Sequence, residues 1–359
     1  MSDASTAPLE SKVVFLCAGF EYTLRDLIDA AHFRGEVESV WTKLLRLVAA
    51  ERKADAENFE FDDNAIEAAV EQFRYQRDLI TAEETEKWLA DRGLSLNDFS
   101  AHFVRHYWDE KWPDLEPDAI EYFSAPNELR DLLTTELILS GELDQMAQRL
   151  SWRVAAHCAA AERPPDAQLI AEERARFFAR CNLEEDQLAG WLEKLDRNAN
   201  WFSEALVMEA IHRRDCAALL SRQAREHEIA ALRLPLTRFD VETIELDSLD
   251  AAREALLCAR DDGMSMEEVA TEGRYPYRHP NVLLEEIPEE LQQKFLSVHP
   301  GDILDPIVHG DGFHLCRIVG KQEPDVDDPI VQERAENRIL DRHFADLTTR
   351  YIQWRILLA

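Results

Sequence analysis

Helical spacing of apolar residues, which persists from Leu24 to about residue 233, most constrains what this chain of 359 residues can fold into. Helix start signals recur along this stretch. Thr81 and Ser95 each precede an acidic residue three positions later, which is the pattern of a capping box. Pro113 and Pro117 interrupt the pattern and mark a break between groups of helices. The stretch therefore predicts a large region built from helices.

A short buried strand is expected before these helices. Val13–Ala18 is an apolar run, Gly19–Tyr22 reads as a turn, and Thr23 can cap a helix that starts at Leu24. The run is too short for an export signal, and no stretch approaches the ~18 apolar residues of a membrane span. We therefore expect no membrane insertion and a cytoplasmic location.

Short motifs recur in the same order along the helical region. Leu24–Leu27 is repeated as Leu129–Leu132, and Trp88-Leu as Trp191-Leu, at separations between 103 and 106 residues. Chance likeness between helical sequences is the alternative to duplication. The shared order favours duplication, and it predicts two related helical modules at residues 1–118 and 119–234.

Near Pro235 the sequence pattern changes from helices alone to a mixture of strands and helices. Arg238–Leu246 alternates with the period of a strand, and residues 249–260 follow as a helix. Two closing strands are expected at residues 303–308 and 313–319, on either side of a turn at His309–Gly312. A small α/β domain at residues 235–322 is therefore predicted, and the fold class of the chain is α+β.

One long helix is expected from about Pro329 onward. Its apolar stripe runs from Val331 to Trp354 at helical spacing, with no evident partner in the small α/β domain. We therefore expect the C-terminal segment, residues 323–359, to pack back on the N-terminal helices.

Three stretches resemble the SurA and PpiC-type chaperones that carry a parvulin domain: residues 13–27, 88–99 and 300–315. The third, Pro-Gly-Asp-Ile-Leu-Asp-Pro-Ile-Val-His-Gly-Asp-Gly-Phe-His-Leu, is similar to the closing half of the parvulin fold and is the most specific. The resemblance implies a helical chaperone-like region that the C-terminal helix completes, joined to a parvulin-like domain. Parvulins catalyse rotation about X–Pro bonds, whose barrier is ~18–20 kcal/mol.

The resemblance also implies site residues. His314 takes the position of the second histidine of the parvulin site, and Thr243 stands where the first is expected. Ile287 and Leu291 fall where the family places the Met and Phe of its proline pocket. The acid or cysteine expected after the second helix has no clear counterpart. A degenerate parvulin site is therefore expected, with an apolar pocket that lacks its aromatic floor.

A loop at Tyr275–Pro280 replaces a glycine-rich stretch of the family. Tyr275 and Tyr277, together with Phe313, are candidates for a wall that binds an extended peptide, since aromatic residues are favoured in binding hot spots. A loop anchored by its own prolines is the alternative. His314 likewise has a structural alternative, in which the hydroxyl of a facing Thr243 satisfies it.

Composition narrows the remaining classes of function. The net charge of −32 disfavours nucleic acid and anionic lipid. Six cysteines are scattered without a CxxC pair, which indicates a reducing compartment rather than a disulfide framework or zinc site. His102 and His106 are four residues apart, but no third ligand is evident. Only 11 glycines argue against a nucleotide cradle, so we expect neither metal nor cofactor.

These features predict a protein that binds a peptide or an unfolded polypeptide as a chaperone does. The client would be a precursor held for maturation or secretion, with a peptide-modifying enzyme as a further partner. Two alternatives stay open, an active peptidyl-prolyl cis-trans isomerase and a scaffold subunit of a peptide-modifying complex.

Overall fold

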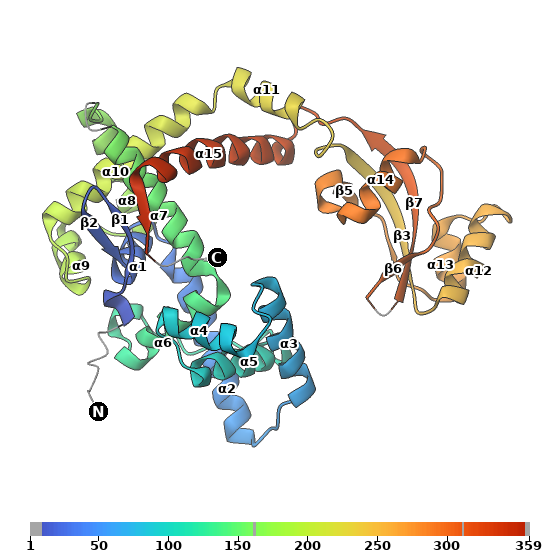
Figure 1. Cartoon of the computed structure of the whole chain (residues 1–359), viewed down its shortest axis with the longest axis horizontal. Coiled ribbons are helices and arrows are strands. Elements are labelled where there is room, and N and C mark those ends of the chain that lie inside the picture. The colour runs from blue at the N-terminus through green and yellow to red at the C-terminus, as the bar shows by residue number, and fades with distance from the viewer. Residues whose placement is uncertain (1–8, 161–162, 311, 356–359) are drawn as a thin grey trace. The chain divides into compact units, whose positions relative to one another are not determined.

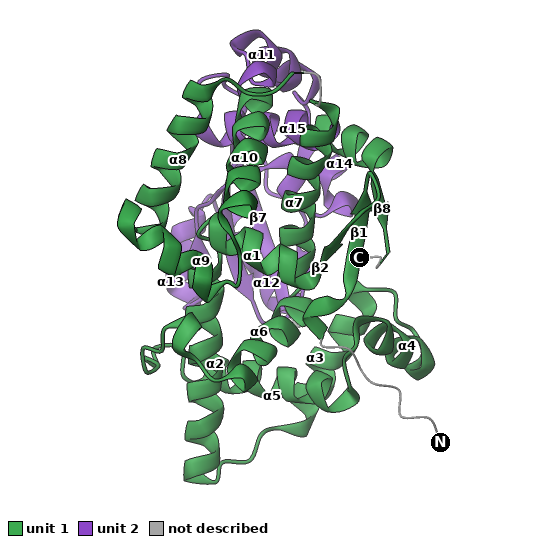
Figure 2. Ribbon diagram, turned by 90° about the vertical axis from the view of Figure 1, so that its left-hand side faces the viewer, with its two compact units in different colours: residues 1–216, 343–359 green, residues 217–342 purple. Residues whose placement is uncertain are grey.

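The computed structural model describes residues 9–160, 163–310 and 312–355 (Figure 1). The chain forms two compact units, one of residues 1–216 with 343–359 and the other of residues 217–342 (Figure 2). Helices and small antiparallel sheets make up both units, which confirms the α+β fold class. No helix in the described ranges is long and apolar enough to cross a bilayer.

The first unit is mainly helical, and local sequence signals begin several of its helices. Thr81 and Ser95 each form a capping box, as the sequence predicts, and Thr23, expected only as a cap, also forms one. The helices are α1 (Leu24–Phe33), α2 (Val37–Glu57), α3 (Asp63–Gln76), α4 (Ala82–Arg92), α5 (Leu96–Lys111), α6 (Asn127–Ser140), α7 (Glu142–Ala159), α8 (Ala167–Cys181), α9 (Leu188–Lys194) and α10 (Ala199–Leu219), the last of which ends in the second unit.

The two groups α1–α5 and α6–α10 contain equivalent aromatic contacts. In each group, a phenylalanine packs edge-on against a tryptophan and a second phenylalanine. The contacts are Phe73 with Trp88 at 5.5 Å and Phe99 at 5.2 Å, and Phe177 with Trp191 at 5.1 Å and Phe202 at 4.9 Å. Equivalent residues lie 103 or 104 positions apart in the sequence. These correspondences favour the internal duplication, which stays a prediction.

Both ends of the chain meet in a three-stranded sheet of the first unit. β1 (Val13–Cys17) lies between β2 (Phe20–Thr23) and β8 (Ile352–Trp354), and all pairings are antiparallel. The prediction of a turn over Gly19–Tyr22 is wrong for its last three residues, which pair with β1. The reversal occurs at Ala18 and Gly19, whose φ angles are 50° and 85°.

The last helix, α15 (Pro329–Tyr351), packs on the helical unit at its C-terminal end, as expected. Phe344 is fully buried, and its ring stacks on Trp152 at 5.1 Å and on His212 at 4.8 Å. The chain then leaves the helix, so Trp354 lies on β8 and packs edge-on against Phe15. The predicted helical stripe is therefore correct to Tyr351 and wrong at Trp354.

The first half of α15 belongs to the second unit and has its own apolar partners there. Val331 and Ala335 are buried against Ile229, Leu236 and Leu283. The expectation that the stripe finds no partner in the smaller unit is wrong for these two positions, because the segment before Arg238 and the strand at Leu283 supply apolar contacts that the sequence pattern did not reveal.

The second unit combines one sheet with flanking helices. Its elements are α11 (Arg222–Ala231), β3 (Arg238–Leu246), α12 (Leu249–Arg260), α13 (Met266–Gly273), β4 (Tyr277–Arg278), β5 (Asn281–Leu283), α14 (Glu289–Ser297), β6 (Ile307–His309) and β7 (Gly312–Gln322). The sheet order is β4-β3-β7-β6, and β5 also pairs with β3. The chain divides into its two compact units after residues 216 and 342, so α11 belongs to the second unit. The domain boundaries expected at residues 118, 234 and 322 stay predictions.

The predicted strand at Arg238–Leu246 and helix at 249–260 are confirmed, and the closing strands differ in their bounds. The first begins at Ile307 rather than at residue 303, and Ile303 makes only an isolated bridge to Arg317. The loop expected at Tyr275–Pro280 contains the short strand β4. Asp311 of the predicted turn lies outside the described residues.

The sheet of the second unit separates two apolar clusters. On one face, Phe239, Val241 and Ile318 pack with Ile287 and with Phe295 of α14. The opposite face has its own cluster, in which α12 and α13 cover the sheet; it contains Ile244, Leu246, Leu315, Ala252, Met266 and Val269. Because side chains alternate between faces along a strand, successive residues of β3 and β7 point toward opposite clusters.

Candidate functional site

A cleft of about 830 Å³ lies on the α14 side of the sheet in the second unit. Its floor is apolar, with Ile287 and Leu291 beside Phe295. Both residues that the sequence places in the proline pocket therefore line this cleft. Phe295 supplies an aromatic ring to the floor, which the sequence analysis did not anticipate.

Polar side chains from β3 and β7 also line the cleft. Thr243 and Glu245 come from β3, and His314 and Cys316 from β7. The register pairs Thr243 with Cys316 and Glu245 with His314. These four residues share the cleft face because each lies two positions from the next along its strand.

His314 has a histidine neighbour in the cleft that the sequence analysis missed. The rings of His309 and His314 stack, with centroids 4.0 Å apart, and both residues line the cleft. Burial, together with His309, lowers the pKa of His314, which favours the neutral imidazole. The glycines at 310 and 312 are the signal that could have found the pair, because they mark a hairpin that brings the two histidines together.

Thr243 contacts a thiol rather than His314. Its hydroxyl lies 3.7 Å from the Cys316 sulfur. The alternative in which the Thr243 hydroxyl satisfies His314 therefore does not hold, because the strand register offsets the two residues. Burial raises the pKa of the Cys316 thiol, so it stays protonated at neutral pH. Beside the charged Glu245, the cleft thus offers neutral donors and acceptors from Thr243, His314 and Cys316, which suit hydrogen bonding of an amide rather than nucleophilic attack.

Tyr275, Tyr277 and Phe313 do not line the cleft. Tyr275 and Phe313 pack against the cluster on the opposite face, and the Tyr277 hydroxyl donates to Glu242 Oε1 over 2.7 Å. These rings therefore form no wall of this cleft, and their part in peptide binding stays a prediction. Phe313 directly precedes His314 on β7, so its side chain leaves the other face of the sheet.

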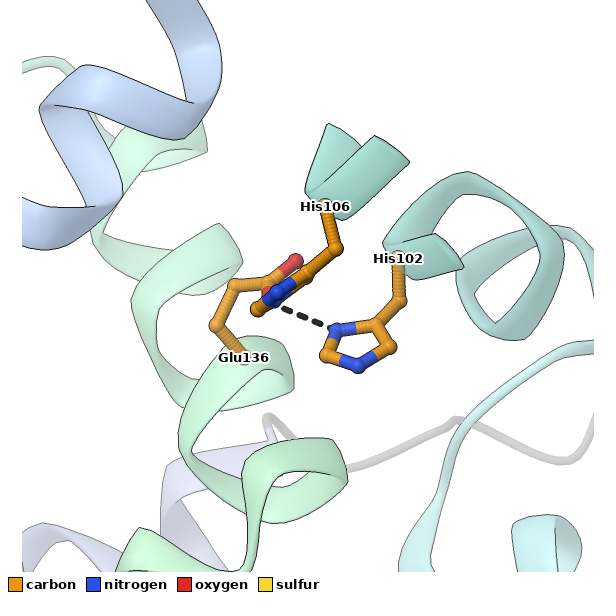
Figure 3. A group of neighbouring side chains, drawn as sticks. All are labelled: His102, His106 and Glu136. Atoms are coloured by element: carbon orange, nitrogen blue, oxygen red, sulfur yellow. Dashed lines mark hydrogen bonds and ion pairs between the residues drawn. The ribbon is translucent and has the colours of Figure 1, made fainter. Parts of the chain in front are cut away.

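The first unit contains a second polar cluster, between α5 and α6. His102 Nδ1 lies 2.7 Å and His106 Nε2 3.3 Å from the same oxygen, Glu136 Oε2 (Figure 3). Arg105 donates to the other oxygen, Oε1, over 2.5 and 2.8 Å. Glu136 is the third possible metal ligand that the sequence analysis did not find, because it belongs to another helix.

The bonding within this cluster matches a satisfied ion pair. His102, Arg105 and Glu136 are all buried. Burial alone would raise the pKa of Glu136, but hydrogen bonds from His102 and His106 and the charge of Arg105 lower it. Burial lowers the pKa of His102, so a neutral ring donates its N–H to the carboxylate. A metal ion on His102 Nδ1 and His106 Nε2 would replace their hydrogen bonds to Glu136 and lie near the guanidinium charge of Arg105, which opposes its binding.

Glu136→Gln keeps the size of the side chain and leaves the buried Arg105 with only the more distant carboxylate of Glu51, 4.0 Å away. We expect the free energy of unfolding at pH 7 to fall by roughly 3 kcal/mol, the order of magnitude for breaking a buried ion pair. Glu110→Gln, an exposed change on the same helix, should change it by less than about 0.5 kcal/mol. Urea denaturation of the three proteins measures both effects.

The pH dependence of this denaturation has a defined sign. Folding lowers both pKa values from ordinary values of 6.5 for His102 and 4.5 for Glu136. Their contributions are therefore present above those values and are lost as the pH falls, the histidine first. The deficit of Glu136→Gln should shrink below about pH 4.5. An equal deficit at every pH, or a rise in Tm on adding Zn²⁺ that His106→Ala abolishes, would contradict the ion-pair interpretation.

Comparison with solved structures finds PrsA proteins, described as peptidylprolyl isomerase or foldase, and SurA-like chaperones. Peptidylprolyl isomerase PrsA from Bacillus cereus is 12% identical, with 62% of this chain and 85% of that chain covered and a TM-score of 0.36. Foldase protein PrsA from Streptococcus pneumoniae is 11% identical, with 63% and 91% covered and a TM-score of 0.26.

A structure from a study of two SurA-like chaperones of Campylobacter jejuni, PEB4 and Cj1289, is 8% identical, with 60% and 89% covered and a TM-score of 0.21. No family model and no curated protein matches the sequence. At these identities and at TM-scores below 0.5, the likeness establishes no activity for this chain.

Proposed function

We propose that this protein is a chaperone-like binder of extended or unfolded polypeptide, and that its client lies in the cleft of the second unit. The observation that carries the proposal is the composition of this cleft, in which apolar Ile287, Leu291 and Phe295 lie with neutral polar side chains and with charged ones such as Glu245 and Arg278. Its volume of about 830 Å³ is within the usual range of ligand sites, about 300–1,000 Å³.

The floor and the polar residues suit different parts of a peptide. An apolar or prolyl side chain on the floor would gain roughly 25 cal/mol for each Å² of apolar surface removed from water. Thr243 and His314 are placed to exchange hydrogen bonds with the amides on either side of that residue. Together they bind a segment by its backbone and one or two apolar side chains, with little further sequence selection.

Strand β6 adds a backbone surface beside the cleft. It is the last strand of the sheet in the order β4-β3-β7-β6, and Ile307, Val308 and His309 all line the cleft. Val308 is 71% exposed. An edge strand with unpaired backbone groups can add an extended peptide by strand pairing, which supports an extended client rather than a helical one.

The charge of the chain bears on the kind of client. A net charge of −32 favours encounter with neutral or basic segments and repels acidic ones. A precursor peptide held in the cytoplasm for a modifying or secreting enzyme is the client that we propose. A scaffold role without peptide affinity is the alternative, favoured if a modifying enzyme binds while peptides do not.

Leu291→Asp places a charge on the floor of the cleft. We expect the Kd for a labelled, proline-containing apolar peptide to rise at least about tenfold, because losing one buried leucine contact is worth roughly 1.5–3 kcal/mol. Fluorescence anisotropy measures the affinity. Leu257→Asp is the matched control, since Leu257 is 56% exposed on α12, and it should bind like the parent.

Two results would overturn this assignment. One is an unchanged affinity in Leu291→Asp, and the other is an equal loss in Leu257→Asp. Circular dichroism and Tm of both variants show whether the unit stays folded.

A second candidate function, peptidyl-prolyl isomerisation, is favoured by the stacked His309 and His314 with Cys316 nearby. In a protease-coupled isomerisation assay we expect no acceleration over the uncatalysed rate, because Thr243 replaces one histidine of the family and the thiol is protonated. Acceleration by the parent that is lost in His314→Ala but kept in His299→Ala, a change at an exposed histidine, would instead identify an active isomerase.

A further inference from the structure

Two cysteine sulfurs of the first unit lie against each other. Cys17 Sγ and Cys158 Sγ are 2.8 Å apart, although 141 residues separate the two cysteines in the sequence. A disulfide bond is about 2.0 Å long, so the sulfurs need to approach by only about 0.8 Å to form one. We propose that Cys17 and Cys158 are an oxidation site, where a low-molecular-weight disulfide converts the thiol pair into an intramolecular disulfide.

The fold holds both cysteines at this contact. Cys17 ends β1, the central strand of its sheet, and pairs with Phe20 of β2 and Ile352 of β8. Cys158 lies in the last turn of α7, which packs against β1. Because hydrogen bonds on both sides fix β1, the sulfur of Cys17 has little freedom to leave Cys158.

The two thiols differ in solvent exposure, and this difference determines which of them reacts first. Cys17 is only 2% exposed, and Cys158 is half-buried. The Cys158 sulfur therefore attacks the small disulfide RSSR first, forming Cys158–S–SR and releasing one RSH. The Cys17 sulfur then attacks the Cys158 sulfur, which forms the protein disulfide and releases a second RSH.

The reaction balances without any other oxidant. The two protein thiols lose two hydrogens and two electrons, and RSSR is reduced to two RSH. Burial, with the hydrogen bond to Cys158, raises the pKa of Cys17 to about 12. The second step is therefore slow at neutral pH and accelerates in alkaline solution, because the thiolate is the attacking species.

The disulfide would join two walls of a groove in the same unit. This groove has a volume of about 540 Å³, and its lining includes Phe20 and Tyr22 of β2 with Leu150 and His157 of α7. Cys17 pairs with Phe20, and Cys158 directly follows His157. Oxidation would thus fix the spacing between the hairpin and the helix. The inference does not depend on the proposed peptide cleft, which lies in the other unit.

Oxidised glutathione, applied to the full reduced chain at pH 8.5, tests the proposal. We expect the free thiols counted in denaturant to fall from six to four, and the intact mass to fall by about 2 Da. Peptide mapping without reductant should recover the Cys17 peptide joined to the Cys158 peptide. Cys258→Ser, a half-buried thiol elsewhere, should leave this linkage intact, whereas Cys158→Ser should prevent it.

Peptide mapping of the parent protein tests whether Cys17 and Cys158 become linked, even if a variant fails to fold. Six thiols after exposure to excess oxidised glutathione would overturn the proposal. So would glutathione adducts at separate cysteines, or a disulfide between two copies of the chain, without the linkage of Cys17 to Cys158.

Discussion

The long antiparallel pairing of β3 with β7 determines which side chains reach the cleft. It runs without a change of partner strand from Arg238, opposite Gln322, to Leu246, opposite Phe313. A slip of one residue would exchange the two faces of β7, and His314 and Cys316 would leave the cleft. Gly312 matters to this register, because a Cβ there would lie 2.7 Å from the carbonyl oxygen of Leu246. The polar side chains of the cleft therefore depend on the register that holds from Val241 to Leu246, after a shift between Asp240 and Val241.

Local signals in the sequence were sufficient for much of the fold. Capping residues located several helices, strand alternation located β3, and Pro329 marked the start of α15. The pairing of strands that are far apart in the sequence could not be predicted from such local signals. β8 forms only because β1 offers it a free edge, and the helical stripe gave no sign that the chain turns into a strand after Tyr351. Short strands of this kind are specified by their partners rather than by their own residues.

The candidate site shows the same division. Ile287 and Leu291 line the cleft, as the resemblance to the parvulin pocket implied, although Ile287 lies before α14 and only Leu291 is on that helix. Tyr277 and Phe313 lie on the face away from the cleft because a strand changes face with every residue, so an error of one position reverses the outcome. Contacts such as Glu136 with His102, 34 residues apart, and the two sulfurs of the first unit need the packed structure before they can be seen.

The central proposal for this molecule is that an extended peptide lies along β6 over the apolar floor of the second unit. Photo-crosslinking measures this most directly, using an apolar peptide with a photoreactive group beside its proline and mass spectrometry of the intact chain's digest. The proposal predicts adducts within residues 287–295 and 307–316 that excess unlabelled peptide abolishes. Competed adducts confined to residues 9–216, with none on the second unit, would contradict it.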